Sequence, residues 1–154
     1  METSQQLSQV IRTPVRTAGA LVESDPLLVD HTSRRLAHRP EAVRRARRIA
    51  ESALTAWGIH DDAAHSVLLV VSELVTNAVE HGQPPLALHL GRECTGPRVW
   101  VGVTDGGPSA GGGPWTSSCA HDEHGRGLAI VEALAAAHGT HRHLGGTTHW
   151  ARLP

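Results

Sequence analysis

One stretch in the middle of the chain, Val70 to Gly82 (VVSELVTNAVEHG), constrains the fold most strongly. Apolar residues recur there at the three- and four-residue steps of an amphipathic helix. On the same helix, Glu73, Asn77 and Glu80 share one stripe, because residues three and four apart are surface neighbours. A carboxylate and a carboxamide on a helix otherwise built for a core favour a ligand-facing role. A simple hydrogen bond between Glu73 and Asn77 on the helix surface is the alternative.

The composition narrows the class of protein. A length of 154 residues fits one domain, and an apolar fraction of 40% without Phe or Tyr predicts an aliphatic core. A formal net charge of −1 argues against a protein whose overall charge drives binding to nucleic acid or to a membrane. Cys94 and Cys119 form no CxxC pair, which favours a reduced, cytoplasmic setting. We see no signal peptide, and the longest apolar run, Val67 to Val71, is too short to cross a bilayer.

The chain divides into a partly ordered extension over residues 1–30 and one domain over residues 31–154. Periodicity, turn residues and caps indicate the elements of that domain. We expect strands at His31–His38, Leu86–Arg92, Arg98–Thr104 and Thr147–Leu153, the middle two as an antiparallel hairpin. We expect helices at Pro40–Trp57, at residues 61–80 with Asp61 and Asp62 as candidate N-caps, and at Leu128–Ala137. The buried face of the last helix would comprise Leu128, Val131, Leu134 and Ala135.

Arginines crowd the segment from Arg34 to Arg48. A solvated cationic face is the simpler interpretation, and a docking surface for an acidic protein is the sharper one. Nucleic acid is less favoured, because no aromatic residues interleave the arginines.

Asp105 ends an apolar strand and precedes two glycines. Its carboxylate could accept a hydrogen bond from an exocyclic amine such as that of adenine, worth about 1.5–3 kcal/mol. An Asx turn is the alternative. The following segment, Gly106 to Gly125, is long enough to form a functional lid.

Gly125-Arg126-Gly127 opens a helix, where unpaired backbone N–H groups form an anion site. A tight turn is the competing interpretation, and the Walker pattern is absent. If phosphates bind there, Asn77 offers an oxygen ligand to Mg²⁺. Glu73 could then accept a proton from a nucleophile that attacks the γ-phosphate.

Together these motifs resemble the GHKL ATPase superfamily with its Bergerat fold, over about residues 38–153. The branch they resemble is that of the anti-sigma factor serine/threonine kinases of the RsbW and SpoIIAB type, with the short actinomycete ATP-binding proteins. Residues 73–78 (ELVTNA) with His81-Gly82 match the N box. Asp105-Gly106-Gly107 matches the adenine box, and Gly125-Arg126-Gly127-Leu128 the second glycine box. Thr148 stands where the last box places a threonine near adenine.

The resemblance implies a two-layer α/β sandwich, with a mixed, largely antiparallel sheet and helices on one face. Its ligands would be ATP and Mg²⁺. Glu73 would be the general base, Asn77 the Mg²⁺ ligand and Asp105 the adenine reader. Gly107 would let the base approach, while Gly125 and Gly127 would present amides to phosphate. The rest of the nucleotide site would comprise His81, Arg126, Leu128 and Thr148.

Two positions depart from the family pattern. Ser109 replaces the second glycine of the adenine box, and Asp122, Glu123 and His124 stand where kinases of this branch tend to carry an arginine. Arg126 is the candidate substitute for that arginine. ATP binding is therefore better supported than phosphoryl transfer.

The resemblance leaves two functions open. The first is an anti-sigma factor that phosphorylates an antagonist protein. The second is a noncatalytic, nucleotide-responsive module that sequesters a sigma factor or another partner. Either protein could be a homodimer. A sensor histidine kinase fragment is disfavoured, since no phosphoacceptor helix precedes the domain. A metal cluster among histidines such as His121 and His124 is also disfavoured, because no spacing matches a familiar zinc site.

Overall fold

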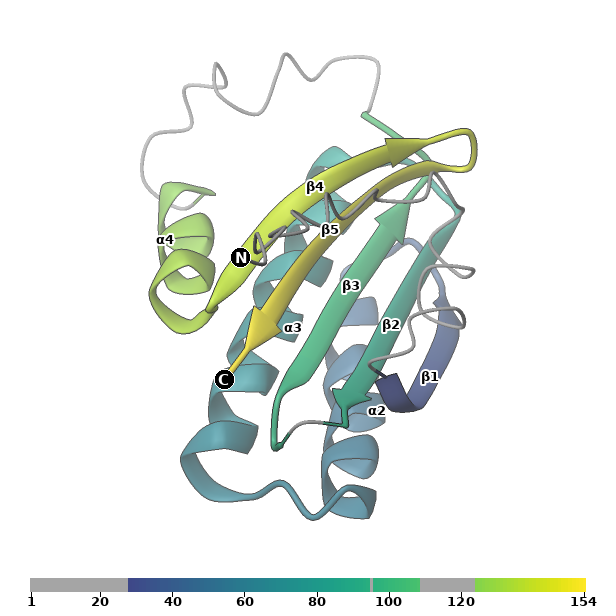
Figure 1. The fold of residues 1–154 in the computed structure, drawn as a ribbon. Coiled ribbons are helices and arrows are strands. Elements are labelled where there is room, and N and C mark those ends of the chain that lie inside the picture. Colours follow the sequence, from purple (N-terminus) through teal and green to yellow (C-terminus); the bar gives the residue numbers. More distant parts are fainter. Residues whose placement is uncertain (1–27, 95, 109–123) are drawn as a thin grey trace, which may run out of the picture.

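The computed structural model describes residues 28–94, 96–108 and 124–154. Within these residues, eight elements follow one another (Figure 1). They are β1 (Leu28–Leu36), α2 (Ala42–Ala56), α3 (Asp61–His81), β2 (Leu86–Glu93), β3 (Val99–Asp105), α4 (His124–Leu134), β4 (Ala137–His143) and β5 (Gly146–Leu153). Most of the expected lid lies outside the described residues, and so do residues 1–27 of the expected extension.

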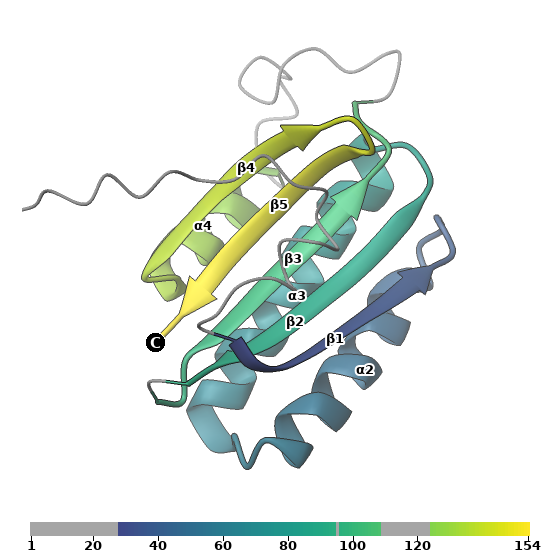
Figure 2. The ribbon, with the colours of Figure 1, turned by 45° about the vertical axis from the view of Figure 1, so that its right-hand side comes forward.

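The strands form one sheet in the order β1-β2-β3-β5-β4. Every pairing between these described strands is antiparallel. The helices cover one face of the sheet, as Figures 1 and 2 show from two sides. The two-layer sandwich is therefore confirmed, and the sheet among the described residues is wholly rather than largely antiparallel.

Helix α3 lies at the centre of the core. Val67, Val70, Val71 and Val75 are fully buried, and they form one cluster with the inward-facing residues of β2 and β3. By length and hydropathy alone α3 could cross a membrane. Its apolar face is occupied instead by the sheet and by α2, since the buried residues of α2 join the same cluster.

The predicted ends of the first two helices are confirmed to within two residues. Helix α2 ends at Ala56, and Gly58 follows it with a φ of +69°, the left-handed conformation that glycine favours after a helix. The N-cap of α3 is His60 rather than Asp61 or Asp62, which occupy the first helical turn. There the two carboxylates face the positive end of the helix dipole.

The region after α4 was predicted wrongly. The helix ends at Leu134, and residues 137–143 form the strand β4 where the sequence suggested the end of a helix and a loop. This edge strand (AHGTHRH) carries almost no large apolar residue, so it lacks the alternation that marks a half-buried strand. Of the residues expected on the buried face of this helix, Val131 is buried and Leu134 and Ala135 pack partly buried against the core, but Leu128 is 38% exposed.

A row of hydrogen bonds crosses all five strands on the face away from the helices. From β1 to β2, Ser33 Oγ lies 2.9 Å from His89 Nδ1. From β2 to β3, His89 Nε2 lies 3.0 Å from Thr104 Oγ1. The row continues from Thr104 Oγ1 to Thr148 Oγ1 of β5 at 2.8 Å, and from there to His143 Nε2 of β4 at 3.0 Å. Each bond joins neighbouring strands, so the row favours the observed register.

His89 is the buried centre of this row. Burial lowers the pKa of its imidazole from 6.5 to about 4, and the nearby His143 adds to the effect. The folded protein therefore keeps His89 neutral at a pH where an unfolded chain would protonate it.

We predict that acid destabilises the fold through His89. Between pH 6.5 and about 4, the unfolded chain binds a proton that folded His89 does not, so stability falls as the pH drops. Replacing His89 with Gln should reduce the loss of unfolding free energy between pH 7 and pH 5 by about 1–2 kcal/mol. Urea titrations at both pH values measure this. His65→Gln, on the exposed side of α3, is the control; equal pH dependence in all three proteins would contradict the prediction.

Candidate functional site

Helix α3 presents Asn77 toward the site from within the core. Asn77 is only 5% exposed, yet its carboxamide makes no hydrogen bond with any residue in the described part of the chain. Buried polar side chains are nearly always hydrogen-bonded in folded proteins. The carboxamide of Asn77 is thus available to a ligand.

Glu73, one turn earlier, lies against the first turn of α4. A Cβ added to Gly127 would collide with the Glu73 Oε2 oxygen, so a larger residue there would require the end of the Glu73 side chain to move. Gly125, Arg126 and Gly127 all belong to that first turn, where backbone N–H groups lack helical partners. The structure therefore brings together Glu73 and the glycine motif that the sequence singled out. The Arg126 side chain lies outside the described part.

Asp105, at the end of β3, forms the other wall of the site. It is 3% exposed, and its Oδ1 oxygen accepts a 2.7 Å hydrogen bond from the Gly107 N–H. Gly107 has a φ of +104°, and a Cβ added there would meet only open space. The Asx turn considered for Asp105 is real. It uses Oδ1 only, and Oδ2 accepts no hydrogen bond from the residues that the structure describes.

The electrostatic environment of Asp105 is unusual for a carboxylate. Burial raises its pKa, while the Gly107 N–H and the charge of His38 pull the pKa back down. His149 Nε2 lies 3.7 Å from Oδ2, but burial lowers the pKa of His149 to about 4, with Arg142 adding to the effect. At neutral pH His149 is uncharged, so it adds no positive charge beside Asp105. A hydrogen-bond donor on a ligand would relieve the cost of burying this carboxylate.

Gly82 lies where the end of α3 meets Asp105. Its φ is −94°, so the backbone conformation does not require glycine. The reason is steric, because a Cβ on Gly82 would lie 2.5 Å from both Cγ and Oδ2 of Asp105. The loop after β3 is hydrogen-bonded to the same place, since Gln83 N–H donates to Gly107 O at 2.9 Å.

His38 fixes the end of α3 from the other side. Its Nε2 lies 3.1 Å from Ala78 O and 3.0 Å from Gly82 O, and carbonyls only accept, so Nε2 carries the proton. Sequence reasoning missed His38, His149 and the steric role of Gly82. The Gly82 next to the helix motif was a usable signal, whereas nothing in the sequence set His38 apart.

Thr148 is not brought to the site. Thr148 pairs with Thr104, whereas its neighbour Thr147 pairs with Asp105. Since paired residues share a face of the sheet and successive residues alternate, Thr147 lies on the face of Asp105 and Thr148 on the opposite one. The predicted position of Thr148 was therefore wrong by one residue, because Thr147 is the threonine on the same face as the Asp105 carboxylate. His81 ends α3 half-buried, with Nε2 3.8 Å from Glu80 Oε2.

Known proteins share this fold. The profile of the family described as the histidine kinase-like ATPase domain matches residues 36–153. Comparison with curated proteins found no match. Among solved structures, the chain is similar to the RsbU and RsbW domains of Rv1364c from Mycobacterium tuberculosis, with a TM-score of 0.62 and 22% identity over 81% of this chain and 32% of that one. The chain thus spans about a third of that structure, and the likeness concerns the fold.

We predict that Gly82→Ala disrupts the site and the fold together. The added methyl would overlap the Asp105 carboxyl group and push the end of α3 away from β3, which should cost about 1–3 kcal/mol of unfolding free energy. Thermal unfolding measures the loss. Gly96→Ala, where a Cβ meets nothing within 4 Å, is a control for glycine loss, although its φ of +133° adds some strain of its own. A Gly82→Ala protein as stable as the wild type would contradict the close contact.

Proposed function

The chain belongs to the histidine kinase-like ATPase family, and we propose that it is a regulatory protein that binds ATP together with Mg²⁺. The observation that carries this proposal is the pair of unsatisfied polar groups on facing elements. Asn77 has a buried carboxamide without a described partner, and Asp105 has a buried carboxylate oxygen without a described donor. Such groups destabilise a fold unless a ligand completes them.

The chemistry of these groups fits the nucleotide. The Asp105 Oδ2 oxygen is an acceptor for the exocyclic amine of adenine, and the open space beside Gly107 leaves room for a flat base. Thr147, on the same face, adds a hydroxyl. Asn77 supplies the neutral oxygen that Mg²⁺ uses beside phosphate oxygens. Bound Mg²⁺ would offset the charge of the phosphates.

The phosphates would approach the first turn of α4. Gly125 and Gly127 would present backbone N–H groups there, with Arg126 and Leu128 as neighbours in the same turn. Glu73 lies against Gly127 and is suitably placed to hold a proton from an attacking hydroxyl.

We infer that the chain acts on a protein partner as an anti-sigma factor with serine/threonine kinase activity in the cytoplasm. The family match and the likeness to a structure that contains an RsbW domain support this direction. The alternative is a noncatalytic module whose grip on a sigma factor or similar partner responds to nucleotide. The acidic residues Asp122 and Glu123, in place of an arginine before the glycine box, favour that alternative.

We predict that Asn77→Ala abolishes the Mg²⁺-dependent part of ATP binding. Loss of a buried polar ligand group should weaken binding at least tenfold, in line with about 1.5–3 kcal/mol for a hydrogen bond to a charged group. Calorimetric titration with ATP, in MgCl₂ and in EDTA, measures the change. His65→Ala, on the exposed side of α3, should bind as the wild type does. Unchanged binding by Asn77→Ala would disprove the Mg²⁺-ATP site.

A second variant distinguishes the kinase from the noncatalytic binding module. Glu73→Ala should keep ATP binding within about threefold of the wild type but lose transfer of labelled phosphate to a copurified partner. Glu51→Ala, exposed on α2, is the matched control. If the wild type transfers no phosphate while ATP changes its affinity for that partner, the protein is the binding module and not the kinase.

A further inference from the structure

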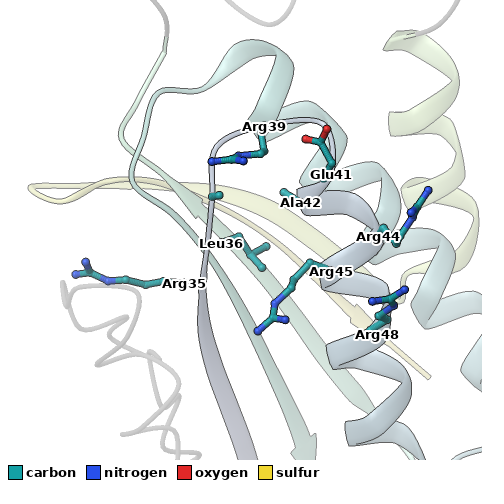
Figure 3. Close-up of a pocket in the computed structure, with 9 residues that line it drawn as sticks. Arg35, Leu36, Arg39, Glu41, Ala42, Arg44, Arg45 and Arg48 are labelled. Atoms are coloured by element: carbon teal, nitrogen blue, oxygen red, sulfur yellow. The ribbon is translucent and has the colours of Figure 1, made fainter.

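A hollow of about 420 Å³ opens between the end of β1 and the start of α2, away from Asn77 and Asp105. Leu36 and Ala42, both part of the core, contribute apolar surface to it. Four exposed arginines of α2 and of the loop before it border that surface, and we call them the arginine rim: Arg39, Arg44, Arg45 and Arg48. Arg35 also contributes to the lining, but it shares the sheet face of Ser33, away from α2. Figure 3 shows Arg45 reaching from α2 into the space beside β1, whereas Arg35 extends on the far side of β1 and Arg44 points away from β1.

The positive charge of the rim is not compensated within the described part of the chain. Glu41 is the one acidic residue that lines the hollow there. None of the rim arginines forms an ion pair or side-chain hydrogen bond with a described residue. Arginines elsewhere do pair: Arg92 binds Asp30 at 2.6 Å, and Arg152 binds Glu93 at 2.5 Å.

The neighbouring Arg47 shows what a structural arginine does on this helix. Its guanidinium donates to Ser72 Oγ at 2.7 Å and to Leu68 O at 3.3 Å, and so joins α2 to α3. The rim residues make no such bonds, although Arg44 and Arg48 repel each other one helical turn apart. Like charges gathered beside an apolar surface, from α2 and the loop before it, are suited to an anionic partner.

The hollow also borders a free sheet edge. Strand β1 is the outermost strand beside β2, and no other described strand pairs with its second edge. Such an edge carries unpaired N–H and C=O groups and can accept an extended peptide as an added strand. The rim therefore lies where an added strand would place its side chains.

We propose that the arginine rim and the free edge of β1 bind an extended, carboxylate-rich segment of a partner protein. Main-chain hydrogen bonds to β1 would hold the segment, and acidic side chains at every second position would face Arg45 and Arg48. An RNA ligand fits less well, because none of the described residues that line the hollow has an aromatic side chain on which a base could stack. The proposal does not depend on nucleotide binding.

The test uses a fluorescein-labelled octapeptide of alternating Glu and Thr. Fluorescence anisotropy should show binding to the full chain that weakens severalfold between 50 and 500 mM NaCl, because exposed charges are screened. The double variant Arg45→Glu/Arg48→Glu should bind the peptide at least tenfold more weakly. Arg98→Glu, at an exposed arginine just before β3, should bind as the wild type does.

Three further measurements decide the outcome. If the charge reversal unfolds the protein by circular dichroism, Arg45→Gln/Arg48→Gln replaces it and should still lose at least threefold. A peptide with the same residues in two blocks, Glu₄Thr₄, should bind more weakly than the alternating one, and equal binding would disprove strand addition. No binding of the alternating peptide by the wild type, or tighter rim-dependent binding of a uridine octamer, would overturn the proposal.

Discussion

At the end of α3, Gly82 lies directly against the carboxyl group of Asp105, and no larger residue fits between them. This contact determines how closely the helix that carries Glu73 and Asn77 approaches the strand that carries Asp105. His38 supports it by donating to the last carbonyls of α3. Gln83 supports it from the loop, with its backbone N–H bonded to Gly107 O. The site thus depends on two rigid elements held at one spacing.

At that spacing, polar atoms of Asp105 and Asn77 are buried without described hydrogen-bond partners. Asp105 has one oxygen in use and one free of described donors, and neutral His149 does not neutralise it. Asn77 is likewise buried without a described partner. Folding must therefore carry a desolvation cost that a ligand can repay. Preorganised polar groups of this kind bind well because they need little rearrangement when the ligand arrives.

Local signals in the sequence predicted a large part of this structure. The 3.6-residue period of α3 and the β-branched run of β3 identified those elements and placed Glu73, Asn77 and Asp105 correctly on them. The backbone freedom of Gly127 predicted its place in the site, and its contact with Glu73 joins the two predicted motifs. The resemblance to a known family then gave the arrangement of sheet and helices.

The remaining features depend on tertiary context. Strand β4 is stabilised by pairing with β5 and not by its own composition, so no local pattern announced it. The choice between Thr147 and Thr148 rests on strand register, and a shift of one residue reverses the face. The hydrogen-bonded row through His89 joins residues more than fifty positions apart, from Ser33 to His89, which sequence spacing cannot reveal.

The central claim is that Asp105 reads the amine of adenine in a nucleotide held by Asn77. The most direct measurement compares the affinities of the wild-type protein for ATP, ITP and GTP by calorimetry in MgCl₂. ITP and GTP carry a carbonyl oxygen where adenine has its amine, and that oxygen would face the buried carboxylate. We predict that ATP binds at least tenfold more tightly than either. Equal affinity for the three nucleotides would contradict the account.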